Sequence, residues 1–109
     1  MTDCIFCKII NKDIPAKIAY EDEEMLVFHD IQPKAAVHLL IIPKKHITSL
    51  AHTTAEDTLL LGKLLQKTAI LAKEFGLTDG YKTQINTGIG GGQEVFHLHL
   101  HVLGTPKPK

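Results

Sequence analysis

Three histidines near the end of the chain alternate with apolar residues: His97, His99 and His101 are separated by Leu98 and Leu100. Because successive side chains of a strand point to opposite faces, a strand here would gather the three imidazoles on one face. A single histidine is more often a surface or structural residue than a catalytic one. Strict alternation directly after a glycine-rich stretch favours a chemical role for this row.

A row of imidazoles suits phosphoryl or nucleotidyl transfer. Imidazole titrates near neutral pH, so one ring can be a neutral nucleophile while another neutralises phosphate or protonates a leaving group. Neighbouring rings disfavour simultaneous protonation, which separates their pKa values. His99 has a histidine on each side of it along the row and is the predicted nucleophile.

The glycine-rich stretch Gly88 to Gly92 ends five residues before the first of these histidines. Glycine lets the backbone approach a phosphate closely and present N–H donors to it. The stretch matches neither the P-loop spacing nor the dinucleotide fingerprint, and most glycine loops are only turns. Its interpretation as a phosphate-binding loop therefore depends on the adjoining histidines.

The elements that must position these residues follow from apolar periodicity and turn signals. Thr54 with Asp57 is expected to cap the one long helix, and Gly76 to end it. Two strands, a long helix and two further strands predict an α+β domain with an antiparallel sheet, whose edges favour pairing between two copies. The expected elements are a short helix over 4–11, strands over 25–30 and 37–42, the long helix over 54–75, and strands over 81–86 and 95–103.

Length and charge limit the possible functions. The 109 residues predict a single domain over 1–109, and 12 Lys plus Arg balance 12 Asp plus Glu, so no basic surface for a nucleic acid polymer or an anionic membrane is expected. The longest apolar run, Leu39 to Ile42, is too short to span a membrane, and Met1 to Asp3 lack signal-peptide features. We therefore expect a cytoplasmic protein with reduced thiols.

The segment His97 to Leu103 resembles the His-φ-His-φ-His-φ-φ signature (φ apolar) of the histidine-triad, or HIT, family. The resemblance covers nearly the whole chain and is strongest to the branch of histidine triad nucleotide-binding (Hint) proteins. The other segments that carry it are Ile5 to Ile10, Phe28 to Ile31, His38 to Ile47 and Gly91 to Gln93.

The resemblance implies a HIT-like fold with about five antiparallel strands, one long helix and one short helix, assembled as a homodimer. It also implies hydrolysis of purine nucleoside 5′-phosphoramidates, with AMP or GMP as product, through a nucleotidyl-histidine intermediate. His99 resembles the nucleophile, and His38, His97 and His101 resemble its supporting histidines. Asp30 corresponds to the residue that holds the ribose hydroxyls, a task that suits a carboxylate.

The remaining nucleotide-binding residues are also implied by the resemblance. The apolar base pocket corresponds to Ile5, Phe6, Ile9, Phe28 and Ile31, for which an ordinary core role is the alternative. The contacts to the phosphate and leaving group correspond to Asn86, Gly92, Gln93, Glu94 and Val95.

Two features depart from the animal Hint proteins. Glu94 stands where those proteins have a serine, and a carboxylate there would repel a second phosphate. The sequence also ends at Lys109, soon after the histidine row, so the contribution that a longer tail makes to specificity in related proteins does not carry over.

Cys4 and Cys7 have the two-residue spacing of a zinc knuckle, which needs two more donors. His46 and His97 can provide them, and their positions match the zinc ligands of some triad proteins and of related hexose-1-phosphate uridylyltransferases. Such a closed site would be structural. The alternatives are two thiols that only pack, or a redox pair, although the βαβ context of thioredoxin-like pairs is absent here.

The leading hypothesis is therefore a nucleoside phosphoramidase that needs no organic cofactor. One alternative is a dinucleoside polyphosphate hydrolase of the same superfamily. Another is a non-catalytic nucleotide- or zinc-binding adaptor, which would have less need of an intact nucleophile.

Overall fold

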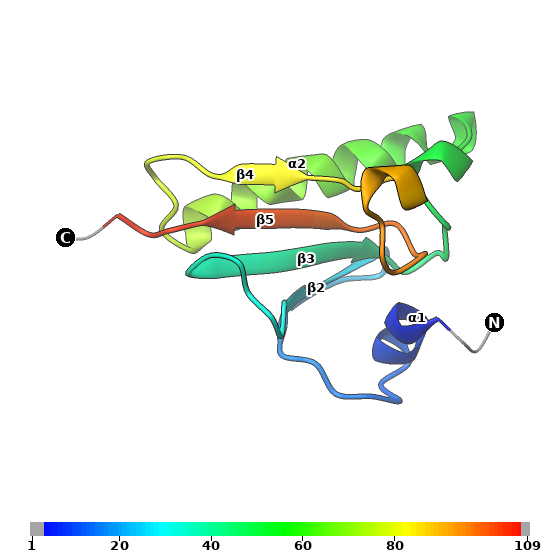
Figure 1. The fold of residues 1–109 in the computed structure, drawn as a ribbon, viewed down its shortest axis with the longest axis horizontal. Coiled ribbons are helices and arrows are strands. Elements are labelled where there is room, and N and C mark those ends of the chain that lie inside the picture. Colours follow the sequence, from blue (N-terminus) through cyan, green and yellow to red (C-terminus); the bar gives the residue numbers. More distant parts are fainter. Residues whose placement is uncertain (1–3, 108–109) are drawn as a thin grey trace.

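A computed structural model describes residues 4–107 and contains one five-stranded antiparallel sheet, with strand order β1-β2-β3-β5-β4 (Figure 1). The predicted α+β class, with one long and one short helix, is confirmed. Met1 to Asp3, which lack signal-peptide features, lie outside the described residues. The elements are α1 (Ile5–Ile10), β1 (Ile18–Glu21), β2 (Met25–His29), β3 (Val37–Pro43), α2 (Thr58–Glu74), β4 (Lys82–Gln84) and β5 (Leu100–Gly104), with 3₁₀ turns at Leu50–His52, Ala55–Asp57 and Ile89–Gly91.

The sheet carries a separate apolar core on each face, because the central strands β2 and β3 bury both sets of alternating side chains. On one face α2 packs through Leu64 and Leu71 against a cluster that includes Leu39 and Val102. Helix α1 lies on the other face (Figure 1). The cluster on that face consists of Phe6, Ile9, Leu26, Phe28, Leu40 and Ile42.

Two strand predictions differ from the structure. Strand β1 was not expected, because its residues are half-buried or exposed and carry a weak apolar pattern. The strand expected over 95–103 begins only at Leu100. Its partner β3 ends at Pro43, which has no N–H to extend the ladder, and the chain bonds instead from the Leu98 N–H to the Ile47 carbonyl.

The long helix also begins later than predicted. Residues Ala55–Asp57 form a 3₁₀ turn, and α2 starts at Thr58. The expected pairing of Thr54 with Asp57 is present as a capping box around that turn. At the other end Gly76 has a φ of 78°, the left-handed conformation that ends a helix most easily at glycine.

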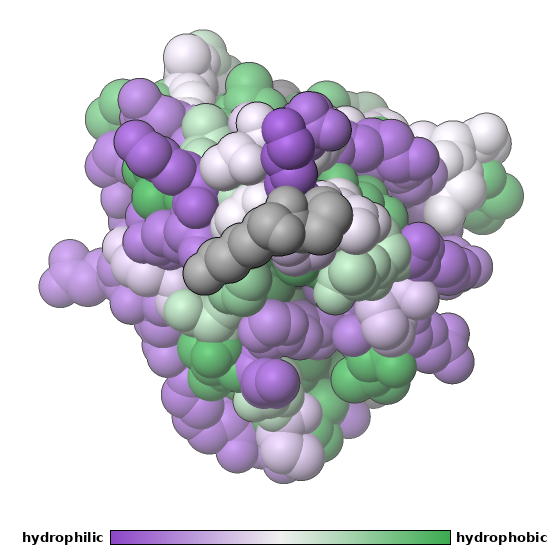
Figure 2. Space-filling model, turned by 90° about the vertical axis from the view of Figure 1, so that its left-hand side faces the viewer, coloured by the Kyte–Doolittle hydropathy of each residue, from purple (hydrophilic) through white to green (hydrophobic). Residues whose placement is uncertain are grey.

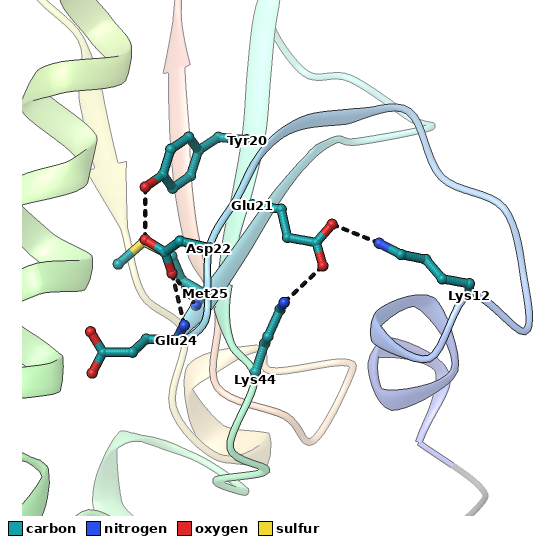
Figure 3. A network of polar contacts seen from close by, with 7 residues as sticks. All are labelled: Lys12, Tyr20, Glu21, Asp22, Glu24, Met25 and Lys44. Carbon is teal, nitrogen blue, oxygen red and sulfur yellow. Dashed lines mark hydrogen bonds and ion pairs between the residues drawn. The ribbon is translucent and has the colours of Figure 1, made fainter.

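An ion-pair bridge connects the exit of α1 to the sheet (Figure 3). The two carboxylate oxygens of Glu21, in β1, each lie 2.7 Å from a lysine nitrogen, one from Lys12 and one from Lys44. Lys12 follows α1 and Lys44 follows β3 directly. Although such surface pairs contribute little individually, this one ties the segment that follows α1 to β1 and to the end of β3.

The surface agrees with the balanced composition. At the end of the molecule where β5 terminates, small apolar areas are interrupted by hydrophilic residues (Figure 2). Within residues 4–107, no helix combines the length and the apolar character needed to cross a membrane.

Candidate functional site

The predicted row of histidines lies on the α1 face of the sheet, although two of the three rings precede β5. Phe6 of α1 packs edge-on against His97 and His99, with ring centroids 5.8 and 5.1 Å apart respectively. The rings of His99 and His101 are 5.0 Å apart. His97 is 0% exposed and His99 is 7% exposed, so these two rings are buried in the core.

A backbone carbonyl determines which nitrogen of His99 carries the proton. Its Nδ1 lies 2.7 Å from the carbonyl oxygen of His97, and because a carbonyl only accepts, Nδ1 must donate. Burial lowers the pKa of His99, which favours the neutral ring. In that neutral ring Nε2 has no proton and keeps a free lone pair, as a nucleophile requires.

His38 and His101 form a hydrogen-bonded pair in which each ring carries its proton on Nε2, whereas His99 carries it on Nδ1. The Lys34 N–H donates to His38 Nδ1 at 3.0 Å, so the proton of a neutral His38 is on Nε2. That Nε2 lies 2.9 Å from His101 Nδ1, which must accept, and the proton of His101 is therefore on its own Nε2. Burial, followed by the neighbouring His99 and His38, lowers the pKa of His101 to about 4.

Asp30 lies beside this pair at the end of β2. One carboxylate oxygen is 3.4 Å from His38 Nε2, and the other accepts from the Gln32 N–H at 2.8 Å. Although Asp30, His38 and His101 are close enough to hold a metal, His38 uses Nδ1 to accept and Nε2 to donate, leaving no lone pair for an ion. We therefore interpret the three residues as a polar chain, in which His38 and His101 are hydrogen-bonded and the Asp30 carboxylate lies within ion-pair distance of His38.

A pocket of about 310 Å³ opens beside this chain. It has the polar composition expected of a site for a sugar and a phosphate. Lys34 and Lys82 also line it; sequence reasoning missed both, because isolated lysines in a loop and on an edge strand carry no distinguishing signal. His99 does not line the pocket, but its ring touches that of His101. The predicted residues that the pocket brings together are Asp30, His38, Asn86, Gly92, Glu94 and His101.

The loop before the histidines is held from within by Gln93, which is 5% exposed. Its side-chain oxygen accepts from the Gly88 N–H at 2.8 Å, and its amide nitrogen donates to the carbonyls of Thr48 and Val95 at 2.8 and 3.0 Å. Gln93 thus shapes the loop with its side chain. In the described part of the chain, the backbone N–H groups of Glu94 and Val95 donate to no protein acceptor and are available to an anion.

Asn86, implied as a contact to the phosphate and leaving group, lines the pocket and is held by the glycine-rich loop. Its side-chain nitrogen donates to the Gly91 carbonyl at 2.7 Å. A Cβ on Gly92, whose φ is 82°, would meet the same nitrogen at 3.4 Å. The glycine at this position therefore allows both the left-handed backbone and the close approach of the amide.

The apolar residues implied as a base pocket divide into two sets. Phe6, Ile9 and Phe28 are buried in the α1 core, where Phe6 and Phe28 pack edge-on with centroids 5.5 Å apart. Ile5 and Ile31 are 48% and 93% exposed. Ile31 directly follows Asp30 and is open to a base, whereas Ile5 lines another hollow together with Val95 and Phe96. The buried residues support the surface from behind.

Two further histidines, His29 and His52, make contacts away from the row. His29 packs edge-on against Phe75, and the His52 ring lies 2.7 Å from the Ser49 hydroxyl. Neither reaches the pocket beside Asp30.

Cys4, Cys7, His46 and His97 converge next to the row, with donor atoms all within 4.8 Å of one another. Sulfur-to-nitrogen separations of 3.3 to 3.6 Å and a nitrogen-to-nitrogen separation of 3.1 Å are recorded. A tetrahedron with ordinary zinc bond lengths has edges of about 3.6 and about 3.4 Å for these atom pairs. His97 donates from Nε2 to the Pro43 carbonyl at 2.8 Å, which leaves the Nδ1 lone pair facing the thiols.

The redox alternative for the cysteine pair has less support. A thiol-disulfide pair needs no further ligands, whereas here His46 and His97 each bring a ring nitrogen to the thiols and complete a set of four donors. The two cysteines and two imidazoles therefore fit a closed metal site better than a thiol-disulfide centre.

Comparison with known proteins agrees with this geometry. The family model described as "Scavenger mRNA decapping enzyme C-term binding" matches residues 3–109. Protein HitA of Neisseria gonorrhoeae is 61% identical over 106 residues, which is 97% of this chain and 99% of that protein. The chain belongs to the HIT family.

Solved structures of HIT proteins share the fold. A HIT family hydrolase from Legionella pneumophila Philadelphia 1 is 48% identical, with a TM-score of 0.91 over 94% of this chain and 92% of that one. A zinc-bound histidine triad family protein from Mycobacterium smegmatis is 41% identical, with a TM-score of 0.82 over 94% of this chain and 75% of that one. The predicted family and fold are thereby confirmed.

The lowered pKa of His101 predicts a pH-dependent stability. Between its folded-state pKa of about 4 and the ordinary value of 6.5, the unfolded chain binds more protons than the folded chain. The free energy of unfolding should therefore decrease as the pH falls from 6.5 to about 4, and decrease less in His101→Gln. Denaturant unfolding of both proteins across this window measures the difference, and parallel curves would contradict a buried neutral His101.

Proposed function

We propose that this HIT protein is a member of the Hint branch that hydrolyses purine nucleoside 5′-phosphoramidates through a nucleotidyl group on His99. The observation that carries the proposal is that the adjacent rings of His99 and His101 carry their protons on different nitrogens. His99 is held with a bare Nε2 and His101 with a protonated one. A nucleophile and a donor thus lie side by side, next to a pocket that Glu94, with its free backbone N–H, also lines.

In the first step the lone pair of His99 Nε2 forms a bond to the α-phosphorus while the phosphorus–nitrogen bond breaks. The leaving nitrogen keeps the electron pair of that bond and needs one proton. The bound phosphate anion favours uptake of one proton from solvent at His38 Nδ1, in place of the hydrogen bond from the Lys34 N–H, and the Asp30 carboxylate stabilises the resulting charge. His101 passes one proton to the amine, leaving the pair neutral.

In the second step water attacks the phosphorus of the nucleotidyl-His99. The proton that water releases returns to the His38–His101 pair, and His99 leaves as the neutral ring with its Nδ1 proton still on the His97 carbonyl. In this step the free N–H groups of Glu94 and Val95 would stabilise the developing oxyanion.

The charges of the pocket favour a single phosphate over a polyphosphate chain. Its carboxylates, Asp30 and Glu94, balance its lysines, Lys34 and Lys82, so no excess positive charge is available for several phosphates. This supports a phosphoramidase over a dinucleoside polyphosphate hydrolase. A base against Ile31, with the ribose at the neighbouring Asp30, completes the proposed AMP or GMP site. The bare nucleophile nitrogen argues against a pure adaptor.

We also propose that Cys4, Cys7, His46 and His97 hold one structural zinc ion. Bound zinc would link α1 to the segment before β5 and offer no open position to substrate. Catalysis would remain with His99. The zinc-bound relative from Mycobacterium smegmatis supports a metal in this family.

A homodimer is the assembly we propose. Strand β4 is an edge strand of the sheet. Helix α2 exposes Leu59, Leu65 and Ile70. An open edge and exposed apolar residues each favour pairing with a second copy. A cytoplasmic location remains a prediction from the sequence.

His99→Asn should reduce hydrolysis of an adenosine 5′-phosphoramidate by about 10³-fold or more, since its amide cannot replace the nucleophile, and change AMP affinity by less than about threefold. Mass spectrometry after quenching without acid should find AMP mass on the peptide with His99 in the wild type only. His52→Asn, which alters an exposed histidine, is the matched control. Adduct on another histidine would overturn the proposed mechanism.

The purified protein is predicted to carry about one zinc per subunit, and Cys4→Ser with Cys7→Ser should remove it. Because the metal contributes to folding, the double variant should melt at a lower temperature yet still form the His99 adduct while folded. Elemental analysis of protein prepared without chelator or affinity tag measures the metal. Wild-type protein that is metal-free, stable and active would refute the zinc site.

A further inference from the structure

Glu94 lies at the boundary between two hollows. It lines the pocket of about 310 Å³ beside Asp30 and His101. It also lines a larger hollow of about 840 Å³, whose apolar wall includes Ile5, Val95 and Phe96. A group that leaves the phosphorus in the first pocket therefore has Glu94 beside it and the second hollow beyond.

The Glu94 carboxylate has no counter-ion within residues 4–107: none of the described ion pairs or side-chain hydrogen bonds includes it. The side chain is exposed. No charged side chain within ion-pair distance therefore competes with a bound molecule for the Glu94 carboxylate.

The backbone fixes how near this charge is to the reacting group. Glu94 and Val95 carry the two free N–H groups assigned to the phosphate, so the carboxylate belongs to a residue that itself contacts the phosphate. A charge on the leaving amine, a few bonds beyond the phosphorus–nitrogen bond, will therefore be close to the Glu94 carboxylate. Opposite charges at such a separation attract even near the surface, and like charges repel.

We infer that Glu94 selects the leaving group, and that the preferred substrates are nucleoside phosphoramidates whose amine carries a second, positive charge. The inference rests on the proposed phosphoramidase function and assigns a substrate class to it. Diamines and other amines with a distant ammonium group fit this class. Amines that carry a carboxylate or a phosphate are disfavoured.

Three adenosine 5′-phosphoramidates of similar size test the inference: those of pentylamine, 1,4-diaminobutane and 4-aminobutanoate, with neutral, cationic and anionic leaving groups. For the wild type, kcat/KM should be highest for the cationic leaving group, lower for the neutral one and lowest for the anionic one. In Glu94→Gln the ratio of cationic to anionic kcat/KM should fall by roughly tenfold, as expected for two changes of charge near one carboxylate. Glu23→Gln, which removes an exposed carboxylate outside both hollows, should keep the wild-type ratio.

Salt dependence in the wild type provides a measurement that needs no variant. Raising the ionic strength should reduce the preference for the cationic substrate, because salt screens exposed charges. Equal ratios of cationic to anionic kcat/KM in the wild type and Glu94→Gln, or a preference that salt does not change, would overturn the inference. Hydrolysis of the pentylamine compound would still support the phosphoramidase in that case. Failure of the wild type to hydrolyse any of the three would overturn both.

Discussion

Strands β3 and β5 pair from Val37 opposite Gly104 to Ile41 opposite Leu100, and this register brings the site together. Leu40 faces His101 and His38 faces Leu103, so the two histidines are diagonal neighbours on the same face of the sheet. A slip of one residue would turn His38 to the α2 face and break its bond to His101. The two cores hold the register, because β3 buries apolar side chains on both faces.

Backbone groups then set the chemistry of the rings. Carbonyl oxygens of His97 and Pro43 accept from His99 and His97, and the Lys34 N–H donates to His38. Each ring therefore has one nitrogen committed to the fold and the other directed at a metal, a neighbour or a substrate. Burial lowers the pKa values of His38, His99 and His101 and favours the neutral rings that this arrangement requires.

The sequence predicted the parts that depend on local pattern. Alternation placed the histidines on one side of the sheet, and the Thr54–Asp57 cap was present as expected. Parts that depend on distant partners were missed or misplaced. The strand before Leu100 was overextended because its length is set by Pro43 in another strand, and the structural role of Gln93 depends on the Thr48 carbonyl far along the chain. Ile31, implied as a pocket residue, is almost fully exposed.

The central claim is that the fold holds His99 with a proton on Nδ1 and a bare Nε2 beside a His101 with the reverse arrangement. Nitrogen-15 NMR of the imidazole rings near neutral pH measures this directly, because protonated and bare ring nitrogens have distinct shifts. The account predicts the Nδ1–H tautomer for His99 and the Nε2–H tautomer for His38 and His101. An Nε2–H tautomer at His99 would contradict it, because the nitrogen assigned to attack phosphorus would then carry a proton.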